Sequence, residues 1–178
     1  MTPIPKPHIH PPVRPLTGGK AVLAFGSNLG DREAAIRAGV DALAAHGIRI
    51  SAMSTLVESV AVKPGGEDEA APRYLNGVAL VSTILAPHDL LRTIHAVETE
   101  LGRVRLERWG DRTLDIDIVA YGDLVLDDQD LILPHPRAAQ RTFVLSPWLE
   151  LDPDAVLPGS GRVDALLAAL EAQPGADA

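Results

Sequence analysis

The segment 114–121 constrains the fold more than any other part of this chain, because its side chains alternate between two sets. One set is wholly apolar: Leu114, Ile116, Ile118 and Ala120. The other set begins with two carboxylates: Asp115, Asp117, Val119 and Tyr121. A period of two is that of a β-strand, whose successive side chains point to opposite faces of a sheet. The segment therefore predicts a strand with one face on a core and two carboxylates on the other.

Two carboxylates at this spacing favour a bound metal ion. Side chains two residues apart on one face of a strand lie roughly 6.5–7 Å apart at the backbone. Two ionised carboxylates repel each other and resist desolvation, so a partner is expected. Mg²⁺ prefers oxygen ligands and is usually completed by waters and substrate phosphates. We therefore expect Asp115 and Asp117 to bind Mg²⁺.

A basic loop comes directly before this strand. Between residues 103 and 112, four arginines and two acids give a net charge of +2 in a chain of net charge −8: Arg103, Arg105, Arg108 and Arg112 against Glu107 and Asp111. Guanidinium groups stay charged at any working pH and donate paired hydrogen bonds to phosphate oxygens. Carboxylates for a metal beside arginines for phosphate indicate phosphoryl-group chemistry.

Each of these two signals has a plainer interpretation when it stands alone. An Asp-x-Asp on an alternating strand is more often a solvated sheet face than a metal site, and an arginine-rich loop is more often ordinary surface. Here the two signals fall within sixteen residues, with Trp109 and Gly110 between them. Their proximity favours the functional interpretation.

The rest of the chain alternates between strand and helix patterns. Strands are predicted at 20–25, 48–62 and 74–83, with a hairpin at 125–126 and 131–133. Helices are predicted from Asp31 to Gly47 and over 87–101, 141–151 and 163–172. The segment 63–69, with a proline, two glycines and three acids, predicts a mobile loop. This order predicts an α+β fold with a ferredoxin-like βαβ core, an added hairpin and helices, and three layers, α/β/α.

Length and composition indicate a single domain. The chain has 178 residues, 46% of them hydrophobic, which suits one compact core. Six prolines within residues 1–19 predict a proline-rich flexible tail, followed by one domain over 20–172 and a frayed end at 173–178. Nothing in the sequence indicates a partner copy, and a monomer is expected.

The charge balance argues against two classes of partner. A net charge of −8 opposes general binding to nucleic acid or to a membrane surface, since both need a broad basic face. The chain has no cysteine, which excludes disulfides and thiolate metal sites. It also has no run of eighteen apolar residues and no apolar signal-peptide core. We expect a cytoplasmic protein.

The residues from Arg108 to Ile118, Arg-Trp-Gly-Asp-Arg-Thr-Leu-Asp-Ile-Asp-Ile, resemble the signature of 6-hydroxymethyl-7,8-dihydropterin pyrophosphokinase, an enzyme family of folate biosynthesis. Three further stretches resemble the family in the same order: Ala24–Gly30, Tyr74–Asn76, and Leu133–His135 followed by Arg141–Phe143. The resemblance covers about residues 20 to 160, and four matching motifs in one order make chance improbable.

The resemblance implies a role for each matching residue. The catalytic set is Arg103, Arg108, Arg112, Asp115 and Asp117, with the two aspartates as ligands of two Mg²⁺ ions. The substrate-binding set, toward the pterin, is Tyr74, Asn76, Trp109, Phe143 and Arg141. The cofactor-binding set, toward the nucleotide, is Glu98, Arg105, Ile118 and His135. Tyrosine and phenylalanine rings offer flat stacking faces and asparagine offers a paired donor and acceptor, which suits a pterin ring.

The resembled enzymes transfer the terminal pyrophosphoryl unit of ATP to the hydroxymethyl oxygen of the pterin and release AMP. ATP and 6-hydroxymethyl-7,8-dihydropterin are therefore the implied partners, with ATP as co-substrate. Two rival functions stay open. A sensor of the same fold would bind pterin or nucleotide without releasing AMP. A kinase that transfers one phosphoryl group would release ADP, although the chain has neither a Walker motif nor protein-kinase motifs.

Overall fold

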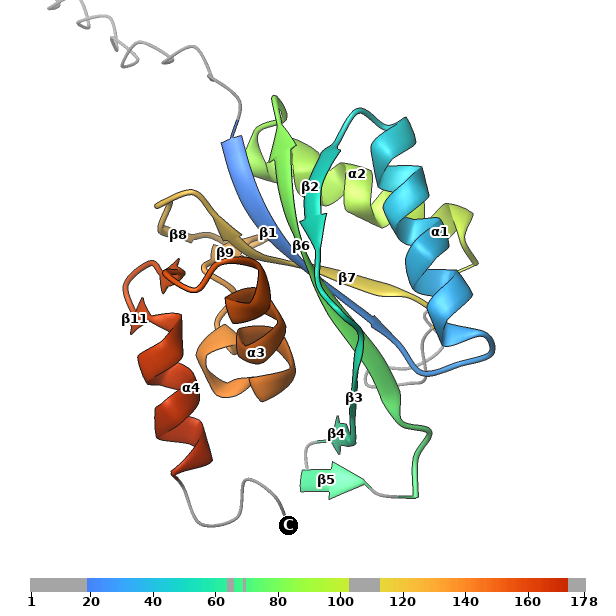
Figure 1. Cartoon of the computed structure of the whole chain (residues 1–178). Helices are drawn as coiled ribbons and strands as arrows, with labels where there is room; N and C mark the ends of the chain where they lie inside the picture. The colour runs from blue at the N-terminus through green and yellow to red at the C-terminus, as the bar shows by residue number, and fades with distance from the viewer. Residues whose placement is uncertain (1–18, 64–65, 69, 103–112, 173–178) are drawn as a thin grey trace, which may run out of the picture.

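The computed structural model describes residues 19–63, 66–68, 70–102 and 113–172. Its main sheet is antiparallel throughout and has the strand order β2-β6-β1-β7, with β3 pairing the start of β6 (Figure 1). These strands are β1 (Gly19–Ser27), β2 (Arg49–Met53), β3 (Val57–Ser59), β6 (Tyr74–Thr83) and β7 (Asp115–Tyr121). The two longest strands, β1 and β6, are central, and β2 and β7 form the edges.

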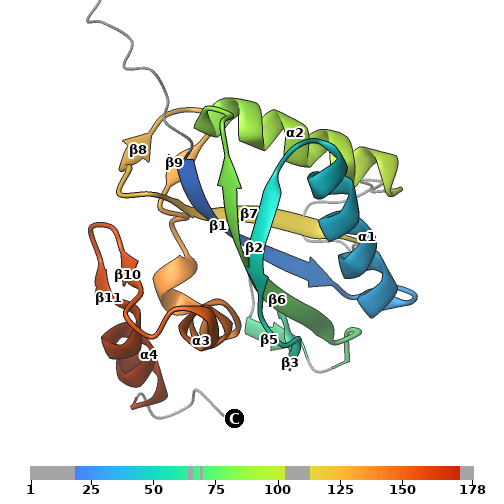
Figure 2. The ribbon, with the colours of Figure 1, turned by 45° about the horizontal axis from the view of Figure 1, so that its top comes forward.

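Helices cover both faces of this sheet, and the two views agree on which helices lie where (Figures 1 and 2). On one face, α1 (Arg32–Ala45) and α2 (Pro87–Glu100) bury a core with residues such as Leu23 and Ile94, both fully buried. On the other, α3 (Thr142–Leu151) packs on the sheet and α4 (Val163–Glu171) packs against α3. The predicted α+β class is thus confirmed, and the antiparallel sheet is a finding of the structure.

The helix boundaries follow the local chemistry that the sequence predicts. Asp31 caps α1, because its Oδ1 accepts a hydrogen bond from Ala34 N at 3.0 Å. Pro87 is the first residue of α2, where a missing N–H costs nothing. Gly47 and Gly102 follow the ends of the two helices with φ of 79° and 83°, a conformation that glycine adopts without strain.

The predicted alternation of β7 holds only as far as Ile118. Leu23 and Val22 of β1 are adjacent, yet they pair with Ile118 and Ala120, so Val119 is an extra residue in β7. This β-bulge shifts the alternation by one residue. Tyr121 therefore joins the core with Ile118, and Ala120 packs in the opposite core with Val119, contrary to prediction. A bulge depends on how a strand pairs with its neighbour, and the periodicity of one strand does not indicate that pairing.

Three other predictions need correction. The single strand expected at 48–62 is three strands: β2, β3 and β4 (Ala61–Lys63). The loop expected at 63–69 instead contributes β5 (Gly66–Asp68), which pairs with β4 as a small hairpin. The strand expected at 20–25 is longer and runs from Gly19 to Ser27. A side chain at position 19 would meet the hydroxyl group of Tyr121, so the close approach requires glycine there.

The C-terminal part contains small elements that the sequence patterns do not predict. The predicted hairpin β8 (Leu126–Asp127) and β9 (Ile132–Leu133) is present. The unpredicted elements are the short helix η1 (Ala138–Gln140) and the hairpin of β10 (Val156–Leu157) with β11 (Gly161–Arg162). Within the described ranges, no helix has the length and apolar character needed to span a membrane.

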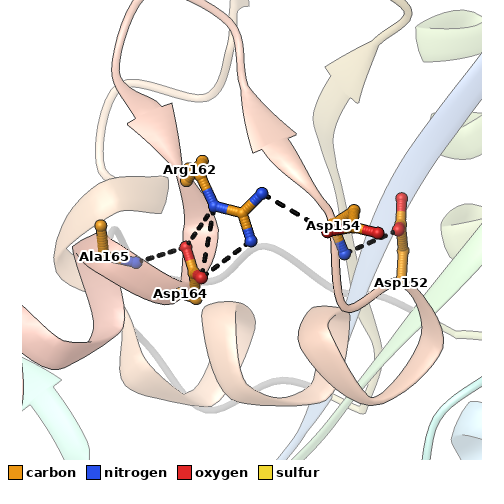
Figure 3. A network of polar contacts seen from close by, with 5 residues as sticks. All are labelled: Asp152, Asp154, Arg162, Asp164 and Ala165. Atoms are coloured by element: carbon orange, nitrogen blue, oxygen red, sulfur yellow. Dashed lines mark hydrogen bonds and ion pairs between the residues drawn. The ribbon is translucent and has the colours of Figure 1, made fainter.

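A polar network holds the β10–β11 hairpin to the start of α4 (Figure 3). Arg162 Nη2 donates to Asp164 Oδ2 at 2.8 Å, and Arg162 Nη1 donates to Asp154 Oδ1 at 3.4 Å. Asp164 Oδ1 also accepts from Ala165 N at 2.7 Å. The hydrogen bonds from Arg162 and then from Ala165 hold the pKa of Asp164 below its ordinary value. This network links the turn before β10 to the first turn of α4, and its residues line neither of the cavities described below.

Candidate active site

A cavity of about 290 Å³ opens between the sheet and α3. Its lining comes from five parts of the chain: Ala24, Phe25, Gly26 and Asn28 from β1 and the turn after it, Ser59, Val60 and Ala61 from β3–β4, Tyr74 and Asn76 from β6, Asp115 and Asp117 from β7, and His135, Arg137, Gln140, Arg141, Phe143 and Val144 from the segment that leads into α3. We call this the ring cavity after Tyr74 and Phe143, two of the three aromatic residues that line it; the third, Phe25, belongs to the core beneath α1 and α2.

A second cavity of about 350 Å³ lies beside the first and shares three of its residues. The shared residues are Asp115, Asp117 and His135. The other lining residues come from α2, β7 and the β8–β9 hairpin: Leu91, His95, Ile116, Ile118, Gln129, Asp130, Leu131, Ile132 and Pro136. We call this the polar cavity. The aspartate pair of β7 therefore lies where the two cavities meet.

Asp117 has two cationic or potentially cationic neighbours. Arg141 Nη1 donates to Asp117 Oδ2 at 3.2 Å, and His135 Nε2 lies 3.6 Å from the same oxygen. The Arg141 guanidinium also lies 5.7 Å from the centroid of the Phe143 ring, within cation–π range. Arg141 thus connects the aromatic wall of the ring cavity to the acidic pair, and offers donors to any anion held there.

The bulge in β7 holds His135 in place. The backbone oxygen of Val119, the extra residue, accepts a hydrogen bond from His135 N at 2.9 Å. His135 Nδ1 accepts from Arg137 N at 3.1 Å, so the neutral imidazole carries its proton on Nε2, toward Asp117. Burial lowers the pKa of His135 below its ordinary value; Asp117 opposes this shift, and Arg141 and Arg137 reinforce it.

This lowered pKa predicts a pH dependence of stability. Below the unfolded pKa of about 6.5, the unfolded chain takes up a proton at this histidine that the folded chain does not. The free energy of unfolding therefore decreases as the pH is lowered from that value toward the folded pKa. His135→Asn keeps an acceptor for Arg137 N and removes the titration. We expect the Tm of the natural protein to fall more than that of His135→Asn between about pH 7 and about pH 5.5. Equal falls in a thermal scan would contradict the assignment.

Asn76 is fixed by the strand beside it. Asn76 Nδ2 donates to Ser59 Oγ at 2.9 Å and to the Val57 carbonyl at 3.4 Å, which sets the plane of a side chain that is 5% exposed. Gly26 leaves space next to it: a Cβ there would lie 3.4 Å from Asn76 Oδ1 and 3.7 Å from Tyr74 Cδ1. The ring cavity therefore presents an oriented amide beside an aromatic ring, as a flat heterocycle requires.

A carboxylate of α3 joins the two walls of the ring cavity. Glu150 Oε1 accepts from Thr55 N at 3.0 Å, and Glu150 Oε2 accepts from Thr55 Oγ1 at 2.7 Å. These bonds, the hydroxyl bond first, hold the pKa of Glu150 below its ordinary value. Thr55 lies between β2 and β3, so this contact holds α3, the helix that carries Phe143, near the strand that ends at Ser59. No motif in the sequence points to this pair.

The structure brings together most of the residues that the resemblance implies. Tyr74, Asn76, Arg141 and Phe143 line the ring cavity, Ile118 lines the polar cavity, and Asp115, Asp117 and His135 line both. Five of the implied residues lie outside the described ranges: Arg103, Arg105, Arg108, Trp109 and Arg112. Cavity residues that the resemblance does not single out include Asn28, Ser59, Gln140 and His95. His95 lies about one helical turn before Glu98, and this spacing is only a weak indication from sequence that His95 faces the site.

Glu98 is placed differently from the other implied residues. Its side chain is 2% exposed and belongs to neither cavity lining. Glu98 Oε1 accepts a hydrogen bond from Ile116 N at 2.8 Å, so Glu98 contacts the backbone between the two aspartates. Its role toward the nucleotide stays a prediction, whereas its contact with β7 is direct.

The donor set of the shared wall suits a hard divalent cation. Asp115 and Asp117 lie on the same face of β7 and line both cavities, and the Asp117 side chain is 35% exposed. Within the described part of the chain, no group of three or more histidine, aspartate or glutamate side chains could enclose a metal on its own. Two carboxylates with further ligands from water and phosphate match the way that Mg²⁺ is bound in phosphoryl-transfer sites.

Two cavities that share Asp115 and Asp117 could hold two ligands whose ends meet at one acidic pair, which is the arrangement that a group-transfer enzyme needs. Residues 22–153 match the family model described as 7,8-dihydro-6-hydroxymethylpterin-pyrophosphokinase (HPPK). The chain therefore belongs to the HPPK family, whose members are pyrophosphokinases of folate biosynthesis.

Curated relatives agree with this family. The 2-amino-4-hydroxy-6-hydroxymethyldihydropteridine pyrophosphokinase of Pseudomonas aeruginosa is 42% identical over 163 residues, covering 88% of this chain and 98% of that protein. The enzyme of the same name from Bacillus subtilis is 40% identical over 132 residues, covering 74% of this chain and 77% of that protein. Both relatives carry the name of a pyrophosphokinase, which confirms the resemblance found in the motifs.

Solved structures support the fold. A Plasmodium falciparum HPPK-DHPS crystal structure with pteroate aligns with a TM-score of 0.64 at 16% identity, covering 86% of this chain and 42% of that one. The wild-type HPPK-DHPS structure from the same organism aligns with a TM-score of 0.65 at 14% identity, covering 86% of this chain and 41% of that one. This chain thus spans less than half of those chains, and at this identity the likeness concerns the fold.

Proposed function

We propose that this protein transfers the terminal pyrophosphoryl unit of ATP to the hydroxymethyl oxygen of 6-hydroxymethyl-7,8-dihydropterin, with two Mg²⁺ ions, and releases AMP. One observation carries the proposal: Asp115 and Asp117 lie where the ring cavity and the polar cavity meet. A pterin in the first cavity and a nucleotide in the second would therefore present their reacting groups to the same two carboxylates.

In this reaction the hydroxymethyl oxygen forms a bond to the β-phosphorus of ATP. The bond between that phosphorus and the oxygen bridging it to the α-phosphorus breaks, AMP leaves with that oxygen, and the hydroxyl proton passes to solvent. Asp115 and Asp117 would hold the two Mg²⁺ ions, which neutralise charge on phosphate oxygens when bound. The protein's remaining contribution is to position and orient the two substrates.

The side chains around the acidic pair suit this positioning. Tyr74 and Phe143 offer ring faces to the pterin, and Asn76 offers an amide whose plane is already fixed. Neutral His135 carries a proton on Nε2 that can be donated to a phosphate oxygen. Arg141, next to Asp117, can turn its donors to the transferred group. Arg103, Arg105, Arg108, Trp109 and Arg112 are proposed to complete the phosphate contacts and the pterin side.

A product assay tests the proposal. Purified protein is incubated with ATP, Mg²⁺ and 6-hydroxymethyl-7,8-dihydropterin, and AMP is separated from ADP by ion-exchange chromatography. We expect AMP to form in step with a pyrophosphorylated pterin, and only when Mg²⁺ is present. ADP would show transfer of a single phosphoryl group instead. Binding of pterin without any nucleotide product would favour the sensor.

Four finer expectations, on the fold, the oligomeric state, the localisation and the partners, belong with this proposal. The order of the four long strands, with β1 and β6 central and a helix after β1 and after β6, supports a ferredoxin-like core within three layers, α/β/α. A monomer in the cytoplasm remains our expectation, as do partners limited to ATP and the dihydropterin, without nucleic acid or membrane. Analytical ultracentrifugation would test the oligomeric state.

A further inference from the structure

Two buried polar contacts lie on either side of Asp115 and outside both cavities. Ser27 Oγ donates to the Thr113 carbonyl oxygen at 2.6 Å, and the Ser27 side chain is fully buried. Glu98 Oε1 accepts from Ile116 N at 2.8 Å, and Glu98 is 2% exposed. One contact therefore holds the backbone two residues before Asp115, and the other holds the peptide nitrogen directly after it.

These contacts come from two different elements. Ser27 is the last residue of β1, and β1 is the only long neighbour of β7 in the main sheet among the described strands. Glu98 lies in the last turn of α2, which packs against β7 on the face of the sheet that α1 and α2 cover. Because β7 is an edge strand, one row of its N–H groups has no strand partner, and Glu98 satisfies one of these groups.

We propose that Ser27 and Glu98 are positioning residues for the metal-binding pair, Ser27 by fixing Thr113 and Glu98 by fixing Ile116. We call the two contacts the β7 bracket. This inference rests on the proposed function, in which Asp115 and Asp117 bind Mg²⁺. Neither residue lines a cavity; the bracket sets the backbone from which Asp115 projects, and thus the separation of the two carboxylates.

A physical argument favours this role over simple satisfaction of buried groups. Register in the middle of β7 is held by pairing with β1, from Gly26 opposite Asp115 to Ala21 opposite Tyr121. Asp115 is the first residue of the strand, and Thr113 and Leu114, the described residues directly before it, have no pairing with β1 that would restrain its backbone. Loss of the groups that orient metal ligands typically costs about 10–100-fold in metal affinity.

Ser27→Ala is the principal test, because it removes one hydroxyl without adding bulk. We expect the Mg²⁺ concentration for half-maximal turnover at saturating ATP to rise about tenfold, while pterin affinity, measured by fluorescence titration, stays within about twofold. Thr83→Val is the matched control. Thr83 is also buried, its Oγ1 accepts from Leu85 N at 3.1 Å, and it pairs with Gly19 at the far end of β1.

Glu98 is tested by two variants that separate hydrogen bonding from charge. Glu98→Gln retains an oxygen that can accept from Ile116 N, and Glu98→Leu does not. We expect Glu98→Leu to need about tenfold more Mg²⁺ and Glu98→Gln to stay near the natural protein. Equal effects of the two variants would assign the role to the charge and overturn the backbone role of Glu98.

A direct metal titration separates failure of this inference from failure of the proposed function. Mn²⁺ binding is followed by electron paramagnetic resonance with a non-hydrolysable ATP analogue present. Weaker Mn²⁺ binding by Ser27→Ala than by Thr83→Val supports the bracket, even if the natural protein releases no AMP. AMP release with unchanged Mn²⁺ binding by Ser27→Ala overturns the bracket alone. Absence of Mn²⁺ binding to the natural protein overturns the metal assignment and the bracket with it.

Discussion

Asp115→Asn is expected to lower kcat by about a hundredfold to a thousandfold, while the fold stays intact. Asparagine keeps the size of aspartate but removes the charge that would hold a divalent cation, and it is the cation that would neutralise charge on the transferred group. The loss of one of two neighbouring negative charges also relieves repulsion in the free protein. Single-turnover measurement of AMP formation, together with a thermal scan, checks both parts of this prediction.

The two aspartates should differ in one respect. Asp117→Asn also removes the carboxylate partner of Arg141, which lies at 3.2 Å, so its effect includes release of that side chain. Asp115→Asn is therefore the cleaner test. Asp123→Asn is the matched control, since Asp123 is exposed in the turn after β7 and lines neither cavity. Full activity in both Asp115→Asn and Asp117→Asn would refute the metal assignment.

Phe143→Ala is expected to raise the dissociation constant for the pterin by about tenfold to a hundredfold. Stacking of a flat heterocycle on an aromatic side chain contributes about 1–3 kcal/mol by alanine substitution. Phe143 also lies under the Arg141 guanidinium, so its removal frees that side chain as well. Fluorescence titration with the pterin measures the effect, and the KM for ATP should change much less because Phe143 does not line the polar cavity.

Tyr74 offers the matched comparison on the opposite wall of the ring cavity. Tyr74→Phe keeps the ring and loses only the hydroxyl, so it should bind the pterin almost as well as the natural protein. Tyr74→Ala loses the ring face and should resemble Phe143→Ala. If Tyr74→Phe were as weak as Tyr74→Ala, the hydroxyl rather than the ring would be the group that matters.

Much of the architecture follows from local patterns in the chain. A cap at Asp31, a first-turn proline at Pro87 and glycines after each helix specify where α1 and α2 begin and end, because these effects act within one turn. The period of two in residues 114–118 specifies β7 and places Asp115 and Asp117 on the same face. These predictions succeed because the physical causes lie within a few residues of one another.

Several site features depend on residues that are far apart in the sequence. The bulge at Val119 arises from pairing with β1 and supplies the carbonyl that holds His135. Glu150 and Thr55 are 95 residues apart, yet their contact joins the two walls of the ring cavity. Neither feature leaves a periodic or compositional trace, so neither could be predicted from one sequence.

By itself, the sequence determined the family, the order of the main strands and helices, and most of the chemical groups of the site, because motifs and periodicity are local. Only the tertiary structure decided that the aspartate pair lies where two cavities meet, that Glu98 contacts the backbone of β7, and that Ser27 holds Thr113. Those relations are created when the sheet and helices pack together, since packing brings distant donors and acceptors within hydrogen-bond distance and leaves space where ligands can enter.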